Sequence, residues 1–162
     1  MAADLLADGN IKATWAVTIA NITAPTVAEL TAGSAVDLEC FITLDGLDIK
    51  GDTASVDNTA LCSTDDTEEP GRVSYNIELT VKRKEVAVED KGWNTLVDRA
   101  LGYLVVRRST SASTAWTIGQ PCEVYPVRCG RPIMEQPEKN SAQKFKVKLF
   151  NNSAAEDRAT VA

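Results

Sequence analysis

The sequence predicts a mainly β fold, in which a β-sandwich or barrel carries one packed α-helix. Several segments alternate apolar and polar residues with a period of two, as half-buried strands do. One segment alone has the spacing of three and four residues that marks an amphipathic helix. The chain has 162 residues, of which 44% are apolar, and this suffices for a single domain over residues 1–162 with a buried core.

The N-terminal part begins with a predicted strand and a short helical turn. Apolar side chains stand at every second position over residues 11–19, which predicts a half-buried strand. Thr26 stands three residues before Glu29, the spacing of a capping box, and Gly33 follows as a stop signal. We therefore expect a short helical segment between residues 25 and 33.

A predicted hairpin and a predicted long loop come next. Asp45-Gly46 stands between two β-prone runs and predicts a turn that joins strands at 36–44 and 47–51. The residues that follow, 52–72, are polar, rich in Asp and Thr, and without clear periodicity. They predict a long acidic loop, and loops of this length in compact domains usually have a function at an interface.

The middle of the chain predicts the longest strand and the one good helix. Apolar residues alternate with polar ones from Val73 to Val81, and the alternation ends at the basic triplet 82–84. A helix is predicted over 93–104 with Gly102 near its end, and a strand follows directly at 103–109. The apolar residues with helical spacing are Trp93, Leu96, Val97, Ala100, Leu101 and Leu104.

The C-terminal part predicts further short strands after a polar loop at 109–115. Three prolines between residues 121 and 132 confine these strands to edges or strand starts. The last strand is predicted over 144–151, and the residues 1–9 and 151–162 are expected to be flexible. In that strand Phe145, Val147 and Leu149 alternate with Lys144, Lys146 and Lys148.

Charge and hydropathy exclude several classes of function. The chain has 17 basic and 23 acidic residues, a net charge of -6, which does not suit binding of nucleic acid through its phosphates. No apolar stretch approaches the roughly 18–20 residues that cross a bilayer. The N-terminus contains Asp4 and Asp8 and lacks a basic segment followed by an apolar one. We therefore expect no signal peptide and a protein that stays in a cytoplasm.

The chain contains no histidine, which is the usual general base and a common metal ligand. We therefore predict no catalytic residue, no metal site and no cofactor. The four cysteines are separated by 22, 60 and 7 residues and fit no paired zinc-binding pattern. They are predicted to be free thiols, with a Cys122–Cys129 disulfide as the alternative.

The stretch LCSTDDTEEPGR places Asp65, Asp66, Glu68 and Glu69 within five positions. An EF-hand that began at Asp65 would need Gly at its sixth position and Glu at its twelfth, where this chain has a proline and an isoleucine. Adjacent acids in a loop also lack the facing geometry of a glycosidase pair. The cluster predicts a solvated loop, with a contact with a charged partner and weak binding of Ca²⁺ or Mg²⁺ as the alternatives.

Several motifs of the chain follow one another in an informative order. A strand ends in D-G-L at 45–47, an acidic segment closes on E-E-P-G-R at 68–72, and G-Y-L-V-V-R follows at 102–107. This order resembles that of the major tail (tail tube) proteins of long-tailed phages that infect actinobacteria. With the final segment QKFKVKLFNNSAAEDRATVA, the resemblance covers residues 30–162.

The resemblance implies a structural virion protein of a siphovirus, with a β-sandwich flanked by a helix. Six such subunits close into a ring, and the rings stack into a tail tube, a conduit for DNA during ejection. The implied partners are other copies of the chain and tail proteins such as the tape measure and the tail terminator. DNA would pass without specific binding, no membrane is involved, and assembly takes place in the host cytoplasm.

We expect the acidic cluster to form contacts between stacked rings, with the lysine-bearing face of the last strand as its partner. The Asp45-Gly46 hairpin and part of 73–83 are expected to line the lumen. Two alternatives are another virion or surface β-sandwich that binds a capsid or carbohydrate, and a carboxylate enzyme without histidine. The candidate inter-ring residues are Asp65, Asp66, Glu68, Glu69, Lys144, Lys146 and Lys148.

Overall fold

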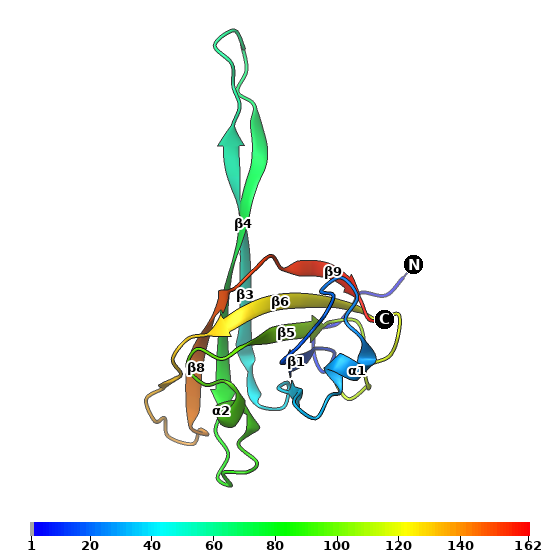
Figure 1. The fold of residues 1–162 in the computed structure, drawn as a ribbon. Coiled ribbons are helices and arrows are strands. Elements are labelled where there is room, and N and C mark those ends of the chain that lie inside the picture. The colour runs from blue at the N-terminus through cyan, green and yellow to red at the C-terminus, as the bar shows by residue number, and fades with distance from the viewer. Residues whose placement is uncertain (1) are drawn as a thin grey trace.

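The computed structural model describes residues 2–162, and its strands form one antiparallel sheet (Figure 1). The predicted fold class, mainly β, is confirmed. The strands are β1 (Lys12–Ala16), β2 (Val36–Asp37), β3 (Ile42–Asp57), β4 (Glu68–Lys82), β5 (Leu101–Arg107), β6 (Pro121–Cys129), β7 (Ile133–Met134), β8 (Lys144–Asn151) and β9 (Glu156–Thr160). The helices are α1 (Val27–Leu30) and α2 (Lys91–Thr95).

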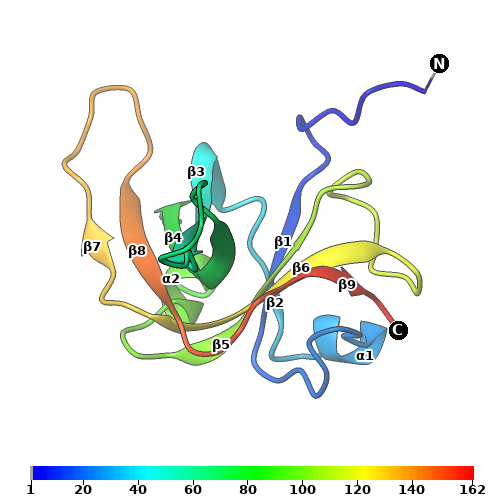
Figure 2. The same ribbon diagram turned by 90° about the horizontal axis from the view of Figure 1, so that it is seen from above.

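The sheet has the strand order β2-β1-β5-β6-β8-β4-β3, with β7 paired to β8 and β9 paired to β6. Strand β6 is the point where the sheet divides. Its first residues pair with β9, whereas residues 127–129 pair with β8. Because the partner changes along one strand, the sheet turns over on itself, and β8, β4 and β3 form a second layer (Figure 2).

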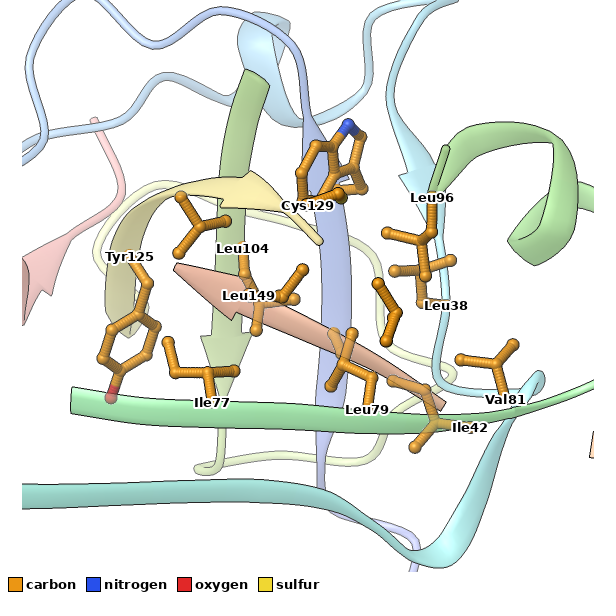
Figure 3. Close-up of a cluster of buried hydrophobic side chains, with 14 of the residues drawn as sticks. Leu38, Ile42, Ile77, Leu79, Val81, Leu96, Leu104, Tyr125, Cys129 and Leu149 are labelled. Carbon is orange, nitrogen blue, oxygen red and sulfur yellow. The ribbon is translucent and has the colours of Figure 1, made fainter. Parts of the chain in front are cut away.

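The larger hydrophobic core lies between these two parts of the sheet (Figure 3). Ile77 and Leu79 point from β4 toward Leu104 of β5 and Leu149 of β8, and all four side chains are fully buried. The alternation predicted over 73–81 and in the last strand is confirmed, because the apolar members of both series face this core.

A second core covers the opposite face of β5 and β6. Val105 and Val124 pack there with Leu30 of α1 and with Val161 near the C-terminus. Strands β1, β5 and β6 are therefore buried on both faces. Helix α1 packs on this face of the sheet, whereas α2 packs on the larger core through Trp93.

The capping box predicted at the start of α1 is confirmed. The hydroxyl of Thr26 accepts the N–H of Glu29 at 3.2 Å, and the carboxylate of Glu29 accepts the N–H of Thr26 at 2.8 Å. The second carboxylate oxygen accepts the N–H of Ala20 at 2.8 Å, which ties the helix to the segment after β1. These hydrogen bonds, that from the Thr26 backbone above all, lower the pKa of Glu29.

The helix predicted over 93–104 is wrong. Helix α2 ends at Thr95, and β5 begins at Leu101 after Arg99, which has a left-handed φ of 63°. Because β5 is buried on both faces, its apolar residues form a continuous run, and such a run coincides with helical spacing. Gly102 lies inside this strand, where the ring of Trp15 occupies the space that a Cβ would need.

The hairpin predicted at Asp45-Gly46 is also wrong. Both residues lie inside β3, at an irregularity where the register with β4 shifts. A Cβ on Gly46 would overlap the carbonyl oxygen of Thr80 in β4. Glycine therefore permits a bulge at this position, and the strand continues past it.

The long acidic loop predicted over 52–72 consists mostly of strand. The ladder between β3 and β4 runs out to the pair Asp57–Glu68, and only residues 58–67 connect the two strands. Residues 51–70 are exposed on both faces of the ladder. No alternation of apolar and polar residues arises in such a ladder, because neither of its faces packs on a core.

The C-terminal residues are not the loose segment that we expected. Residues 156–160 form β9, which pairs with β6, and Ala159 and Val161 are buried in the second core. The N–H of Ala162 also donates to the carbonyl oxygen of Pro25 at 2.9 Å. At the other end of the chain, residues 2–9 lie exposed outside the sheet.

Candidate functional site

The most prominent surface feature is the outer part of the β3–β4 hairpin, residues 51–74, which we call the ribbon. It projects far beyond the rest of the sheet (Figure 1). The ladder between β4 and β8 ends at the pair Ile77–Leu149, so nothing in residues 2–162 lies beside the ribbon strands except each other. An isolated two-stranded ribbon is at best marginally stable in water.

The ribbon also exposes apolar side chains and unpaired strand edges. Val56, Val73 and Leu61 are all exposed, and Leu61 in the connecting loop is as accessible as in an extended chain. The outer edge of β3 has no partner strand in the part of the chain that the structure describes. Such edges are templates for pairing with another molecule. The ribbon is therefore the best candidate for a contact surface.

Residues 51–71 of the ribbon carry a charge equal to the net charge of the protein. Residues 51–71 include six carboxylates and no Lys or Arg, so the 17 cations elsewhere are matched by the other 17 carboxylates. Asp57 and Glu68 stand directly opposite each other in the ladder. Like charges in this arrangement are destabilising, and a cationic partner would relieve the repulsion.

The predicted acidic residues gather at the ribbon tip. Glu68 and Glu69 belong to the last rungs of the ladder, and Asp65 and Asp66 lie in the connecting loop. Glu69 accepts a hydrogen bond from the side-chain amide of Asn58 at 2.9 Å. None of the ion pairs found within residues 2–162 involves these four carboxylates.

The three predicted lysines lie on the outward face of β8. Lys146 Nζ is 3.2 Å from Glu135 Oε1 and 3.8 Å from Glu78 Oε1, and Lys144 Nζ is 3.5 Å from Glu138 Oε2. The hydrogen bond and charge of Glu135 raise the pKa of Lys146. Lys148 Nζ lies 5.3 Å from the centre of the Phe150 ring. Lys144 and Lys146 thus already form ion pairs within the chain, so they are weaker candidates than Lys148 for a contact with a neighbouring copy.

The structure does not bring the acidic tip and the lysines together within one chain. Glu78, beside Lys146, is ten residues along β4 from Glu68, which corresponds to about 33 Å in a strand. Any contact between the two groups must therefore join different copies. Asp45 and Gly46 lie near the lysine end, where Asp45 accepts a hydrogen bond from the Thr43 hydroxyl at 3.2 Å.

A buried polar cluster beside β1 and β2 was not predicted. Lys12 Nζ donates to Asp37 at 2.9 Å and to Glu39 at 3.1 Å, and Asp37 also accepts the hydroxyl of Thr14 at 2.6 Å. Burial opposes the charge of Lys12, but the two carboxylates outweigh it and raise its pKa. The cluster joins residues far apart in sequence, so no local pattern indicated it.

Arg107 extends this cluster into the segment before β6. Its side chain is fully buried and donates to the carbonyl oxygens of Ser111, Thr114 and Ala115 and to the side chain of Gln120, at 2.7–3.2 Å. The indole N–H of Trp116 donates to Thr14 at 3.0 Å. Arg107 thus holds the irregular segment 108–120 against the sheet, which is a structural role.

The tryptophans do not form a carbohydrate-binding platform. Trp15 and Trp116 are buried, and Trp93 lies under Arg83, with the guanidinium 4.0 Å from the ring centre. The aromatic stacking surface that the binding-module alternative needs is absent from residues 2–162.

The cysteines are free, as predicted. Cys122 and Cys129 are seven residues apart on β6 and face opposite cores, so they cannot reach each other. Burial raises the pKa of Cys122 to about 11 and that of Cys129 to about 12. Cys40 and Cys62 are exposed.

Two further features are absent from residues 2–162. Across residues 2–162, no three acidic or cysteine side chains gather as metal ligands would. Neither helix in this part of the chain has the length and apolar character to cross a membrane.

Comparisons with known proteins agree with this picture. The family described as phage tail tube protein matches the chain over residues 1–162. Among curated proteins, no sequence matches the chain. The fold is similar to that of a chain in the cryo-EM structure of the anti-feeding prophage baseplate, which was symmetrised six-fold. The TM-score is 0.53 at 10% identity, with 96% of each chain covered, so this likeness concerns the fold alone.

Proposed function

The chain belongs to the phage tail tube protein family, and on this premise we propose that its copies close into rings that stack into a hollow tube. Membership makes it a structural protein of the phage tail. The observation that supports the proposal most is the ribbon, because residues 51–70 are exposed on both faces and gain burial only from another molecule.

We propose that a ring contains six copies and closes by strand addition. The sheet ends in β2 on one side and in β3 on the other, and the outer edges of both have no partner strand within residues 2–162. Pairing such edges around a ring removes them and leaves a closed barrel. The six-fold symmetry of the anti-feeding prophage baseplate supports the number six.

The tube is proposed to conduct DNA during ejection without binding it specifically. Apart from residues 51–71, the chain has equal numbers of cations and carboxylates, so it offers no excess of positive charge to hold phosphates. The proposed setting is a long-tailed, siphovirus-type particle that infects an actinobacterium, assembled in the host cytoplasm. The tape measure and tail terminator proteins are the further proposed partners.

The contact between stacked rings is proposed to join the acidic ribbon tip of one copy to the lysine-bearing face of β8 in another. The tip has four carboxylates without ion pairs in residues 2–162, and that face has Lys148, which likewise has no carboxylate partner there. Opposite charge on the two surfaces favours this register over one that brings two ribbon tips together.

Neutralising the ribbon tip tests this proposal in an assembly experiment on the purified chain. We expect the wild type to sediment as tubes above a critical concentration. The neutralised variant should need about tenfold more protein at low salt, because each exposed ion pair lost between the tip and the basic face contributes about 0.2–1 kcal/mol. The difference should vanish near 1 M salt, where screening is nearly complete. The substitutions are Asp65→Asn, Asp66→Asn, Glu68→Gln and Glu69→Gln.

A control variant changes the net charge equally at exposed carboxylates outside the ribbon. It should assemble as the wild type does. An equal rise of the critical concentration in both variants would show that only net charge affects assembly, and would contradict a contact at the tip. The control substitutions are Glu85→Gln, Glu89→Gln, Asp98→Asn and Asp157→Asn.

A further inference from the structure

A pocket of about 420 Å³ opens on the outward face of β8, which we call the β7–β8 pocket. Its apolar wall consists of Ile133 and Met134 of β7 and Phe150 of β8, all of them exposed to solvent. The ring of Phe150 packs on Gly130. A Cβ at position 130 would lie 2.9 Å from this ring, so the absence of a side chain at Gly130 lets the ring pack there. Ile133 and Met134 pair with β8 through Lys146 and Phe145.

The rim of the β7–β8 pocket is mainly basic. Arg131, Lys146 and Lys148 line it, together with the carboxylates of Glu78 and Glu135. Lys146 is shared between those two carboxylates. Arg131 and Lys148 take part in none of the ion pairs of residues 2–162. An apolar pocket with two free cations at its mouth fits an apolar side chain flanked by acids.

The ribbon tip presents such a group. Leu61 stands at the far end of the ribbon and is the most exposed large apolar side chain in residues 2–162. Asp65, Asp66, Glu68 and Glu69 follow it within eight positions. We propose that Leu61 of one copy inserts into the β7–β8 pocket of a second copy, with the tip carboxylates at Arg131 and Lys148. This inference rests on the proposed function and specifies its partner surface.

A second apolar pocket fits the tip less well. It has about 380 Å³ and is lined by Ile11, Leu44 and Leu47, among others. The carboxyl-bearing residues Asp8 and Glu39 also line it, and no Lys or Arg does. These carboxylates would repel the acidic tip, so charge selects the β7–β8 pocket.

The length of the ribbon sets the distance between the two copies. Glu78 lines the β7–β8 pocket, and ten residues of strand, about 33 Å, separate it from Glu68 at the tip. With the connecting loop added, copies joined in this way along the ribbon direction repeat at roughly 40 Å. A tube assembled through this contact should show a ring spacing of that order.

Disulfide trapping in assembled tubes tests the contact directly. The background variant has Cys40→Ser and Cys62→Ser, and the buried thiols of Cys122 and Cys129 react poorly with oxidants because their pKa values are raised. To this background we add Leu61→Cys with Ile133→Cys. Mild oxidation of tubes should then give a ladder of cross-linked chains, since a disulfide requires Cα atoms within about 7 Å.

The matched control pairs Leu61→Cys with Leu44→Cys, at the rim of the second pocket, where the side chain is more exposed than that of Ile133. It should give no ladder. If tubes form and the ladder appears with position 44, or with neither position, the pocket assignment is overturned and the proposed tube remains. If the wild type never forms tubes or rings, the proposed function fails, and this inference fails with it.

A second measurement does not depend on the cysteines. Leu61→Ala should raise the critical concentration about tenfold or more, because it removes most of a buried leucine side chain. Leu61→Met should restore assembly. Val56→Ala, in the β3 strand of the ribbon, should raise the critical concentration less than Leu61→Ala does. Equal effects of Leu61→Ala and Val56→Ala would contradict insertion of Leu61 into a pocket.

Discussion

Removal of the ribbon is expected to abolish tube formation while the subunit stays folded. Residues 53–73 are replaced by Asn-Gly, so that Asp52 and Ser74, which already face each other in the ladder, are joined by a two-residue turn. The deleted residues touch neither hydrophobic core. The free energy of unfolding should therefore change by no more than about 1 kcal/mol.

Two measurements separate the effects on folding and on assembly. Chemical unfolding followed by tryptophan fluorescence reports on the cores, in which Trp15 and Trp116 are buried. Sedimentation reports on assembly. A control variant keeps the ribbon and has Ser55→Thr and Ser74→Thr at exposed positions of its strands, and it should assemble normally. Tubes formed by the chain without the ribbon would refute the role given to it.

Arg107→Met is expected to cause the largest loss of stability among substitutions of charged residues. It removes the Arg107 donor from the carbonyl oxygens of Ser111, Thr114 and Ala115, of which Ser111 and Ala115 keep a second donor. A hydrogen bond from a charged group contributes about 1.5–3 kcal/mol, and several are lost together here. We expect a loss of about 3 kcal/mol, which lowers Tm by about 6–12 °C in a chain of this size.

The neighbouring residue provides a matched control for Arg107. Arg108 pairs with Glu123 at 2.9 Å, but its side chain is 42% exposed, so Arg108→Met should cost less than about 1 kcal/mol. Thermal and urea unfolding of both variants measure the difference. Similar losses for the two arginines would show that the buried hydrogen bonds of Arg107 do not stabilise segment 108–120.

Local sequence signals predicted the elements that depend on local interactions or on one buried face. The capping box of Thr26 and Glu29 requires only three residues of spacing, and it forms as predicted. Phe145 and Leu149 alternate with lysines because β8 has one buried and one exposed face. In both cases the physical cause of the structure is visible within a few consecutive residues.

The wrong predictions concern segments whose structure depends on contacts that a few consecutive residues do not reveal. Strand β5 is buried on both faces, so its run of apolar residues resembled a helix. The ribbon is exposed on both faces, so its strands resembled a loop. Asp45-Gly46 has the residues of a turn, yet the contact that requires Gly46 is with Thr80 on another strand. Alternating sequence patterns reveal a strand whose two faces differ in burial, and the two faces of β5 and of the ribbon do not differ.

The candidate site was only partly accessible from the sequence. The acidic tip was predicted as a candidate contact surface, since charge density is a local property. The β7–β8 pocket was not, because Ile133 and Phe150 come together only through pairing of β7 with β8. The role of Arg107 was hidden for the same reason, as its partners lie in an irregular segment without a pattern.

Amide hydrogen exchange of residues 51–57 and 68–74 tests the central claim, that the ribbon is the assembly element, most directly. In the free subunit these amides should exchange quickly, because the ribbon packs on no other segment of residues 2–162. In assembled tubes their exchange should slow by about tenfold or more, whereas amides of the buried strand β5 should change little. Fast exchange of the ribbon in tubes, equal to that of the free subunit, would contradict the claim.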